Sequence, residues 1–158
     1  MSNLAYEHLH HNLKLLKLTT LESILDNYLE ISIKEGKSLI EIIDYLVDQE
    51  IQSREARSKA VRMRIAGFPF NKRLADFDFK YQPSLDKAAI KDITSLRFIR
   101  NAENIVFLGP PGVGKTHLAI GLGIEAIEAG FKVYFVNASN LIEKLEAADK
   151  AKRLDEKM

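Results

Sequence analysis

Cysteine is absent from the 158 residues, so neither disulfide bonds nor thiolate metal sites can contribute to this protein. No apolar run approaches the roughly 20 residues that a membrane-spanning helix requires. Met1 is not followed by the basic segment and apolar core of a signal peptide. The hydrophobic content of 46% and the charged content of 28% are those of a soluble globular chain. We therefore expect a cytoplasmic protein without membrane association.

The net charge is only +1, but the charges are unevenly distributed along the chain. Residues 1–53 carry a balance of −5, residues 54–100 a balance of +7, and residues 101–158 a balance of −1. The basic excess therefore lies in the middle of the sequence. Its first part lies on a long predicted helix and the loop after it, and comprises Arg54, Arg57, Lys59, Arg62, Arg64, Lys72 and Arg73.

Two interpretations of these basic residues stay open. Glu50 can pair with Arg54 at the i, i+4 spacing, which explains one charge as local helix support, and the rest can form a solvated helix face. Alternatively, the basic residues form a surface that contacts the phosphates of a nucleic acid, which gives affinity without sequence specificity. Periodicity alone does not decide between the two.

Residues 109–116 read Gly-Pro-Pro-Gly-Val-Gly-Lys-Thr and match G-x-x-x-x-G-K-[ST], the phosphate-binding P-loop. An apolar run at 104–108 precedes the loop, and a helical pattern at 117–129 follows it. Glycines let consecutive N–H groups point at phosphates, and the helix contributes its unpaired N–H groups and the positive end of its dipole. The sequence therefore predicts a nucleoside triphosphate site.

The predicted cofactors are ATP and Mg²⁺, with Lys115 bound to the β- and γ-phosphates and the Thr116 hydroxyl a ligand of the metal. His117 follows in the first turn of the helix, where it either approaches the nucleotide or packs, and its spacing leaves both open. The predicted nucleotide-binding residues are Gly109, Pro110, Pro111, Gly112, Val113, Gly114, Lys115, Thr116 and His117.

Apolar periodicity predicts a helical region over residues 1–67, with three helices of which the last is long. Capping boxes are predicted at Thr19 with Glu22 and at Ser38 with Glu41, and Gly67 ends the third helix.

Residues 68–103 are interpreted as a linker and a helix capped by Ser84. Phe77 and Phe79 in the linker are expected to lie on the core in a short extended segment.

Residues 104–158 are interpreted as a partial P-loop core with strands at 104–108 and 131–136 and a second helix that follows them. The expected fold class is therefore α/β: a helical N-terminal appendage followed by the first part of a parallel-sheet P-loop domain.

The stretch from Gly109 to Ala119 continues the P-loop with His-Leu-Ala and resembles the IstB-like ATP-binding proteins. These are transposition helpers of bacterial insertion sequences, related to the DnaC helicase loader and more distantly to the DnaA initiator. The resemblance runs from about residue 10 to the C-terminus. Three further stretches agree with the family: Gln49-Glu50 with Arg54 and Arg57, Phe77-Asp78-Phe79, and Leu96-Arg97-Phe98-Ile99.

The resemblance implies an AAA+ ATPase fold, ATP-dependent assembly on DNA, and cooperation with the transposase of the same insertion sequence. It also implies self-association if the protein is full length. It also makes the basic residues between 54 and 73 stronger candidates for DNA or subunit contacts. A complete member of the family continues with an acidic Walker B strand, a sensor strand and arginines that act on a neighbour's ATP. After Val136, no apolar run of this sequence ends in an acidic pair.

Phosphoryl transfer requires a held Mg²⁺, a positioned water and charge-stabilising arginines. We therefore expect a C-terminally truncated helper that binds ATP but hydrolyses it poorly, and we assign no catalytic residue. In P-loop folds of this kind the strands on either side of the P-loop helix are not neighbours, so 104–108 and 131–136 are expected to lack sheet partners. The alternatives are a DnaC-like helicase loader, a small P-loop kinase, and a non-enzymatic interaction fragment with a vestigial P-loop.

Overall fold

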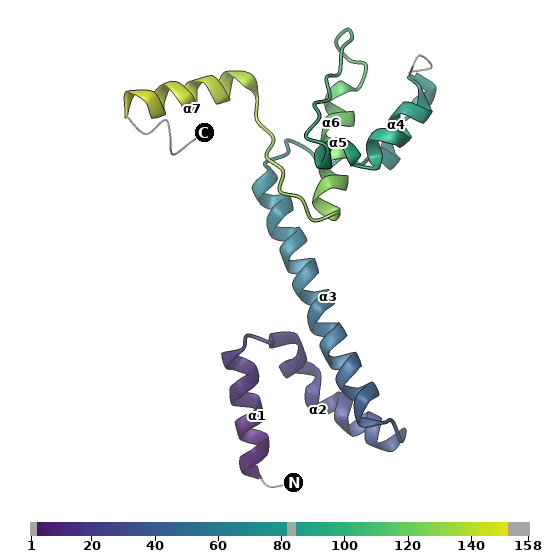
Figure 1. The fold of residues 1–158 in the computed structure, drawn as a ribbon, viewed down its shortest axis with the longest axis vertical. Coiled ribbons are helices and arrows are strands. Elements are labelled where there is room, and N and C mark those ends of the chain that lie inside the picture. The colour runs from purple at the N-terminus through teal and green to yellow at the C-terminus, as the bar shows by residue number, and fades with distance from the viewer. Residues whose placement is uncertain (1–2, 82–84, 152–158) are drawn as a thin grey trace. The chain divides into compact units, whose positions relative to one another are not determined.

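The computed structural model describes residues 3–81 and 85–151, and within those ranges every regular element is a helix (Figure 1). The chain divides into two compact units, Met1–Ser58 and Lys59–Met158, which are described separately. The elements are α1 (Asn3–Leu15), α2 (Thr19–Lys34), α3 (Leu39–Ala66), the 3-10 turns η1 (Leu74–Asp76) and η2 (Phe79–Tyr81), α4 (Lys87–Thr94), α5 (Arg97–Arg100), α6 (Lys115–Glu128) and α7 (Ala138–Lys150).

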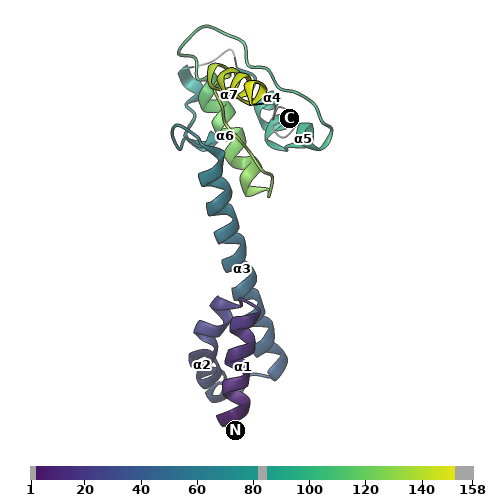
Figure 2. The same cartoon turned by 90° about the vertical axis from the view of Figure 1, so that its left-hand side faces the viewer.

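The N-terminal unit contains the three helices that periodicity predicts, and α1 and α2 lie beside the first half of α3 (Figure 2). One buried side chain from α1, one from α2 and two from α3 form its core: Leu13, Leu25, Ile42 and Leu46. The predicted capping box at the start of α3 is confirmed, because the Ser38 N–H donates to Glu41 Oε2 at 2.8 Å and the Glu41 N–H donates to Ser38 Oγ at 3.3 Å.

The capping box predicted for α2 at Thr19 and Glu22 is wrong, because a carboxylate from a different helix occupies that role. Glu50 of α3 is only 3% exposed, and its Oε2 accepts hydrogen bonds from the backbone N–H groups of Thr20 at 2.8 Å and Leu21 at 3.0 Å. A carboxylate at a helix N-terminus satisfies unpaired donors and favours the positive end of the dipole. The start of α2 is therefore determined by a residue about 30 positions away.

Two of the basic residues hold the other oxygen of Glu50. Arg54 donates to Glu50 Oε1 at 2.9 Å, which confirms the predicted i, i+4 pair, and Arg57 donates to the same oxygen at 3.2 Å. Arg57 also donates to the Thr19 hydroxyl at 2.8 Å, and Arg54 donates to the carbonyl of Lys17 at 3.1 Å. These contacts fasten α3 to the turn between α1 and α2.

The ionisation of Glu50 makes the start of α2 sensitive to acid. Burial alone would raise the pKa of Glu50, but the Leu21 N–H, the Arg54 guanidinium and the Thr20 N–H outweigh it, so the pKa is lowered. A carboxylate with a lowered pKa in the folded state contributes stability above its unfolded pKa, about 4.3, and loses it as the pH falls through the folded value.

We predict that amide-exchange protection at Thr20 and Leu21, measured as protection factors, falls as the pH drops below about 4. Glu50→Gln is the control, because its amide does not titrate: protection should be lower at neutral pH and should not fall further in acid. An equally steep acid dependence in Glu50→Gln would show that another group is responsible.

The second unit is organised around α6, whose buried residues include Ile120, Ile124 and Ile127. Both η1 and α4 pack against this helix. Phe77 is buried with Leu118 of α6, so its predicted place in the core is confirmed, although the surrounding backbone forms 3-10 turns instead of an extended segment.

The parallel sheet predicted around the P-loop is not confirmed, because neither 104–108 nor 131–136 forms a strand. Val106 and Leu108 are 74% and 88% exposed. The Phe135 N–H donates to the carbonyl of Ala66 at the end of α3, at 2.8 Å, rather than to a strand. A parallel strand needs paired neighbours for its backbone groups and cover for both faces. The described residues provide no strand partner for these two segments and cover them only in part, through contacts such as Phe107 on the Phe77 cluster and Phe135 on Phe68.

The helix that follows the linker begins at Lys87, and its N-cap is Asp86, whose side chain accepts a hydrogen bond from the Ala88 N–H at 2.8 Å. Ser84, the predicted cap, lies outside the described residues. None of the helices in 3–81 and 85–151 combines the length and apolar content that a bilayer crossing requires.

Two glycines inside α6 allow the segment of residues 68–77 to lie directly on the helix. A Cβ atom at Gly121 would lie 2.7 Å from Leu74 Cδ2 and 3.0 Å from the Leu74 backbone nitrogen. A Cβ atom at Gly123 would lie 2.7 Å from Phe68 Cζ. Both glycines therefore serve close packing rather than chain flexibility.

We predict that Gly121→Ala destabilises the protein by about 1 kcal/mol or more, although the same change at an open helix position gains up to about 1 kcal/mol. The reason is overpacking against Leu74, and the measurement is the free energy of unfolding in urea. Adding Leu74→Ala should recover part of the loss, and strictly additive effects of the two changes would contradict a direct contact.

Candidate nucleotide-binding site

The loop from Gly109 to Gly114 runs into the N-terminus of α6, which begins at Lys115, so the predicted order of loop and helix is present. Gly114 is the N-cap of α6 with φ of 90°, and Gly112 has φ of 82°. Residues with a side chain rarely adopt this left-handed backbone. A Cβ atom at Gly112 would meet nothing within 4 Å, whereas one at Gly114 would lie 2.6 Å from Phe77 Cε2.

The ammonium group of Lys115 is folded back onto the loop. Its Nζ donates to the carbonyls of Gly109 at 2.8 Å and Pro110 at 2.7 Å. An ammonium group has three donors, so one stays available to an incoming anion while two hold the loop. Positive charge is thus placed beside the N–H groups of the α6 N-terminus, where an anion is favoured.

Thr116 lies in the first turn of α6 and is exposed. Among the residues that the structure describes, no cluster of three or more His, Asp or Glu side chains could hold a metal ion. A hydroxyl fits Mg²⁺, which prefers oxygen ligands and is commonly shared between few protein groups and the phosphates of a nucleotide. The residues present therefore fit ATP with Mg²⁺: Lys115 could hold the phosphates and Thr116 could ligate the metal.

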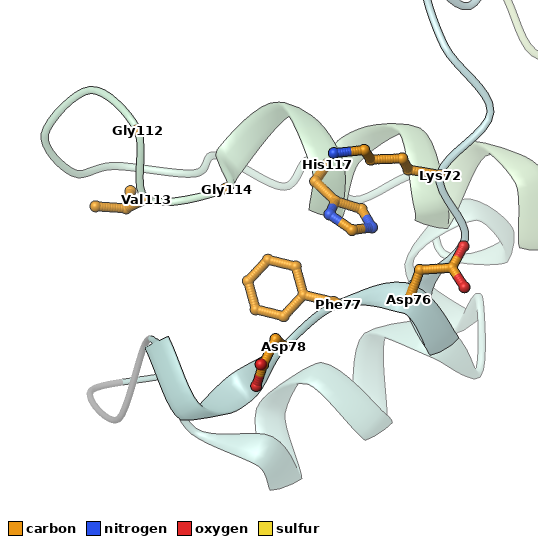
Figure 3. Close-up of a pocket in the computed structure, with 8 residues that line it drawn as sticks. All are labelled: Lys72, Asp76, Phe77, Asp78, Gly112, Val113, Gly114 and His117. Atoms are coloured by element: carbon orange, nitrogen blue, oxygen red, sulfur yellow. The ribbon is translucent and has the colours of Figure 1, made fainter.

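His117 packs in the structure, which is one of the two roles left open for it. Its Nε2 lies 2.8 Å from the Arg73 carbonyl oxygen, so Nε2 carries the proton and donates. Its ring lies edge-on to Phe77, with centroids 5.2 Å apart at 64° (Figure 3). His117 therefore connects the first turn of α6 to the segment before η1.

An open pocket of about 510 Å³ lies beside the loop (Figure 3). It places an aromatic ring, two carboxylates and an ammonium group next to the P-loop glycines. The sequence analysis predicted Phe77 as a core residue of the linker and noted Phe77-Asp78 in the family resemblance, but it did not connect either residue with the loop. The lining residues are Lys72, Asp76, Phe77, Asp78, Gly112, Val113, Gly114 and His117.

Five of the seven candidate DNA-contact residues lie in the second unit, and two of them have hydrogen-bond partners within it. Arg62 donates to the carbonyl of Gly130 at 2.7 Å, and Arg73 donates to Glu128 Oε1 at 2.6 Å. Both contacts place positive charge at the C-terminal end of α6, which favours the negative end of the helix dipole.

The other three candidate DNA-contact residues of this unit, Lys59, Arg64 and Lys72, are exposed. Lys72 Nζ lies 5.7 Å from the centroid of the Phe70 ring. Lys59 and Arg64 make no polar contact with the described part of the chain, so their charges are available to an external anion.

A glycine loop that ends in lysine and threonine at a helix N-terminus is typical of P-loop nucleotide-binding proteins. The chain belongs to the IstB-like ATP-binding proteins, whose family model matches residues 11–158.

Three relatives illustrate this membership, and each is named as an insertion-sequence ATP-binding protein. The protein of IS5376 from Geobacillus stearothermophilus is 43% identical over 121 residues, which are 77% of this chain and 48% of the relative. The protein of IS232 from Bacillus thuringiensis subsp. berliner is 38% identical over 154 residues, 98% of this chain and 62% of the relative. The protein of IS21 from Pseudomonas aeruginosa is 36% identical over 143 residues, 90% of this chain and 54% of the relative. The chain thus spans roughly half the length of these relatives.

Proposed function

We propose that this protein is a cytoplasmic ATP-binding helper for DNA transposition and binds ATP with Mg²⁺ through residues 109–116. The observation that carries the proposal is Lys115 at the N-terminus of α6, bound to the carbonyls of a loop with left-handed glycines. Loop N–H groups and the helix dipole would hold the phosphates, Lys115 would neutralise them, and Thr116 would ligate the metal.

We propose in addition that 104–108 and 131–136 are strand segments of an AAA+ parallel sheet. Family membership supports such a domain. Val106, Leu108 and Tyr134 are more than half exposed, and such side chains would be covered when neighbouring strands and helices are present.

Bound ATP with Mg²⁺ supplies a phosphoryl group activated for transfer to water. Within the 158 residues, Lys115 would supply positive charge and Thr116 would supply a metal ligand. We propose that these residues taken by themselves bind ATP with little turnover, because positioning of water and further charge stabilisation are separate requirements of hydrolysis.

The proposed partners are DNA, the transposase of the same insertion sequence and, for a full-length protein, further copies of itself. The names of the relatives place them in insertion sequences, and the basic excess between residues 54 and 100 supports a polyanionic partner. The proposed DNA contacts remain the seven basic residues from Arg54 to Arg73. Lys59 and Arg64 are the first to test, since neither is engaged by an acidic side chain of the described residues.

We predict that ATP promotes binding of this protein to labelled duplex DNA, measured by fluorescence anisotropy over a range of salt concentrations. Lys59→Ala with Arg64→Ala should weaken binding to every sequence alike and reduce the salt slope by about 2, because each lost phosphate contact removes about 1. Lys91→Ala, a change at an exposed lysine of α4, is the matched control. An unchanged slope in the double variant would remove Lys59 and Arg64 from the DNA contacts.

A further inference from the structure

Phe77 packs directly on the last glycine of the loop. The side chain is 8% exposed and belongs to the cluster that includes Leu118 of α6. A Cβ atom at Gly114 would lie 2.6 Å from its Cε2 and 3.1 Å from its Cζ, so the ring lies where a side chain at position 114 would have to go. The aromatic ring thus limits how far the backbone of Gly114 can move.

The position of Phe77 is in turn fixed by a short turn anchored to α6. The Arg73 carbonyl accepts hydrogen bonds from the Asp76 N–H at 3.1 Å and from His117 Nε2 at 2.8 Å. The Asp76 side chain closes the turn by accepting from the Arg73 N–H at 3.0 Å. His117 therefore joins the turn that carries Phe77 to the same helix that begins at the P-loop.

The contact has an energetic consequence for phosphate binding. Glycine loses more conformational freedom on ordering than any other residue, so closing a glycine loop on a ligand has a large entropic cost. Neighbouring groups that restrict the loop before binding reduce that ordering cost and so increase affinity. A Cβ atom at Gly112 would meet nothing within 4 Å, whereas the Phe77 ring occupies the place of a Cβ atom at Gly114.

We propose that Phe77 and His117 are positioning residues for phosphate binding: Phe77 holds Gly114 in place, and His117 holds the turn that carries Phe77. This inference rests on the proposed binding of ATP at residues 109–116. Phe77 acts on the loop and not on the ligand. Its effect is therefore the same for a nucleotide and for a phosphate chain that has no base.

The test compares ATP with inorganic tripolyphosphate, both with Mg²⁺, by isothermal titration calorimetry on the full chain. Phe77→Leu keeps an apolar side chain but loses the ring, and it should weaken both ligands by a similar factor of about five to ten. His117→Ala should weaken both ligands too. His117→Gln should retain most of the affinity, because its amide N–H can still donate to the Arg73 carbonyl.

A purely structural role is separated by Phe68→Leu, the same change at another aromatic residue. Phe68 packs on Gly123 in the second half of α6 and on Phe135, away from the loop, so this change should lower the melting temperature and leave both affinities of the folded protein unchanged. If Phe77→Leu does not fold, the His117→Ala and His117→Gln pair carries the test.

The outcomes are distinct. A loss of affinity for ATP alone, with tripolyphosphate unaffected, would show that Phe77 contacts the base and would overturn positioning of the loop. Unchanged affinities in Phe77→Leu and His117→Ala would overturn the inference while leaving ATP binding intact. If the wild-type chain binds ATP and tripolyphosphate no more tightly than Lys115→Ala does, the proposed function itself is overturned.

Discussion

Replacing Lys115 with alanine is expected to weaken ATP binding by about 100-fold, a loss of roughly 2.7 kcal/mol. The change removes the positive charge at the start of α6 and the two hydrogen bonds that hold the carbonyls of Gly109 and Pro110. The phosphates would then face a loop that has lost both a charge-assisted donor and part of its internal support. Calorimetric titration of ATP with Mg²⁺ into each variant measures the effect.

Lys91→Ala is the matched control for Lys115→Ala, since it removes one exposed lysine of the same unit outside the loop. It should bind ATP as the unchanged chain does. The melting temperature of both variants separates loss of the ligand contact from loss of the fold. Equal ATP affinity in Lys115→Ala and Lys91→Ala would mean that Lys115 does not contact the phosphates.

Replacing Glu50 with alanine is expected to destabilise the N-terminal unit by about 2–3 kcal/mol. The change removes the acceptor for the N–H groups of Thr20 and Leu21 and leaves the guanidinium groups of Arg54 and Arg57 without their shared carboxylate. Because both arginines are about half exposed, water replaces part of what they lose. Urea unfolding, with amide exchange in α2 as the local probe, measures the loss.

Glu55→Ala is the matched control, because Glu55 is an exposed acidic residue on the same helix. A surface change of this kind should cost no more than about 0.5 kcal/mol. Glu50→Gln should be intermediate, since an amide oxygen can still accept from the α2 N–H groups but no longer carries charge. A cost for Glu50→Ala as small as that of Glu55→Ala would contradict the capping role of Glu50.

The sequence patterns correctly predicted those elements that are determined by residues close together in the chain. The capping box of Ser38 and Glu41 joins residues three apart, and the three N-terminal helices follow apolar periodicity. The order of loop and helix at Lys115 follows from the P-loop spacing. In these cases the interacting residues lie close together in the sequence, so their spacing contains the geometry.

Long-range contacts explain what the patterns missed. The Thr19 and Glu22 box has the correct spacing, but the buried Glu50 reaches the same N–H groups from another helix. Likewise Phe77 and Gly114 are 37 positions apart, and no local pattern relates an aromatic ring to a loop glycine.

The basic residues show the same limit of local reasoning. Arg62 and Arg73 have intramolecular partners at Gly130 and Glu128, which are 68 and 55 positions away. The place of Arg62 on the long helix and of Arg73 in the loop after it could be predicted from the sequence, but these partners could not. The predicted strands failed for a related reason, because strand formation depends on paired neighbours that the segment itself does not contain.

The most direct test of ATP binding at residues 109–116 is an NMR titration that follows the backbone amide signals of the chain as ATP with Mg²⁺ is added. The structure predicts saturable shifts concentrated at Gly112, Gly114, Lys115 and Thr116, since these residues surround the positive N-terminus of α6. Saturable shifts confined to other parts of the chain, or no saturable shift at all, would contradict the phosphate site.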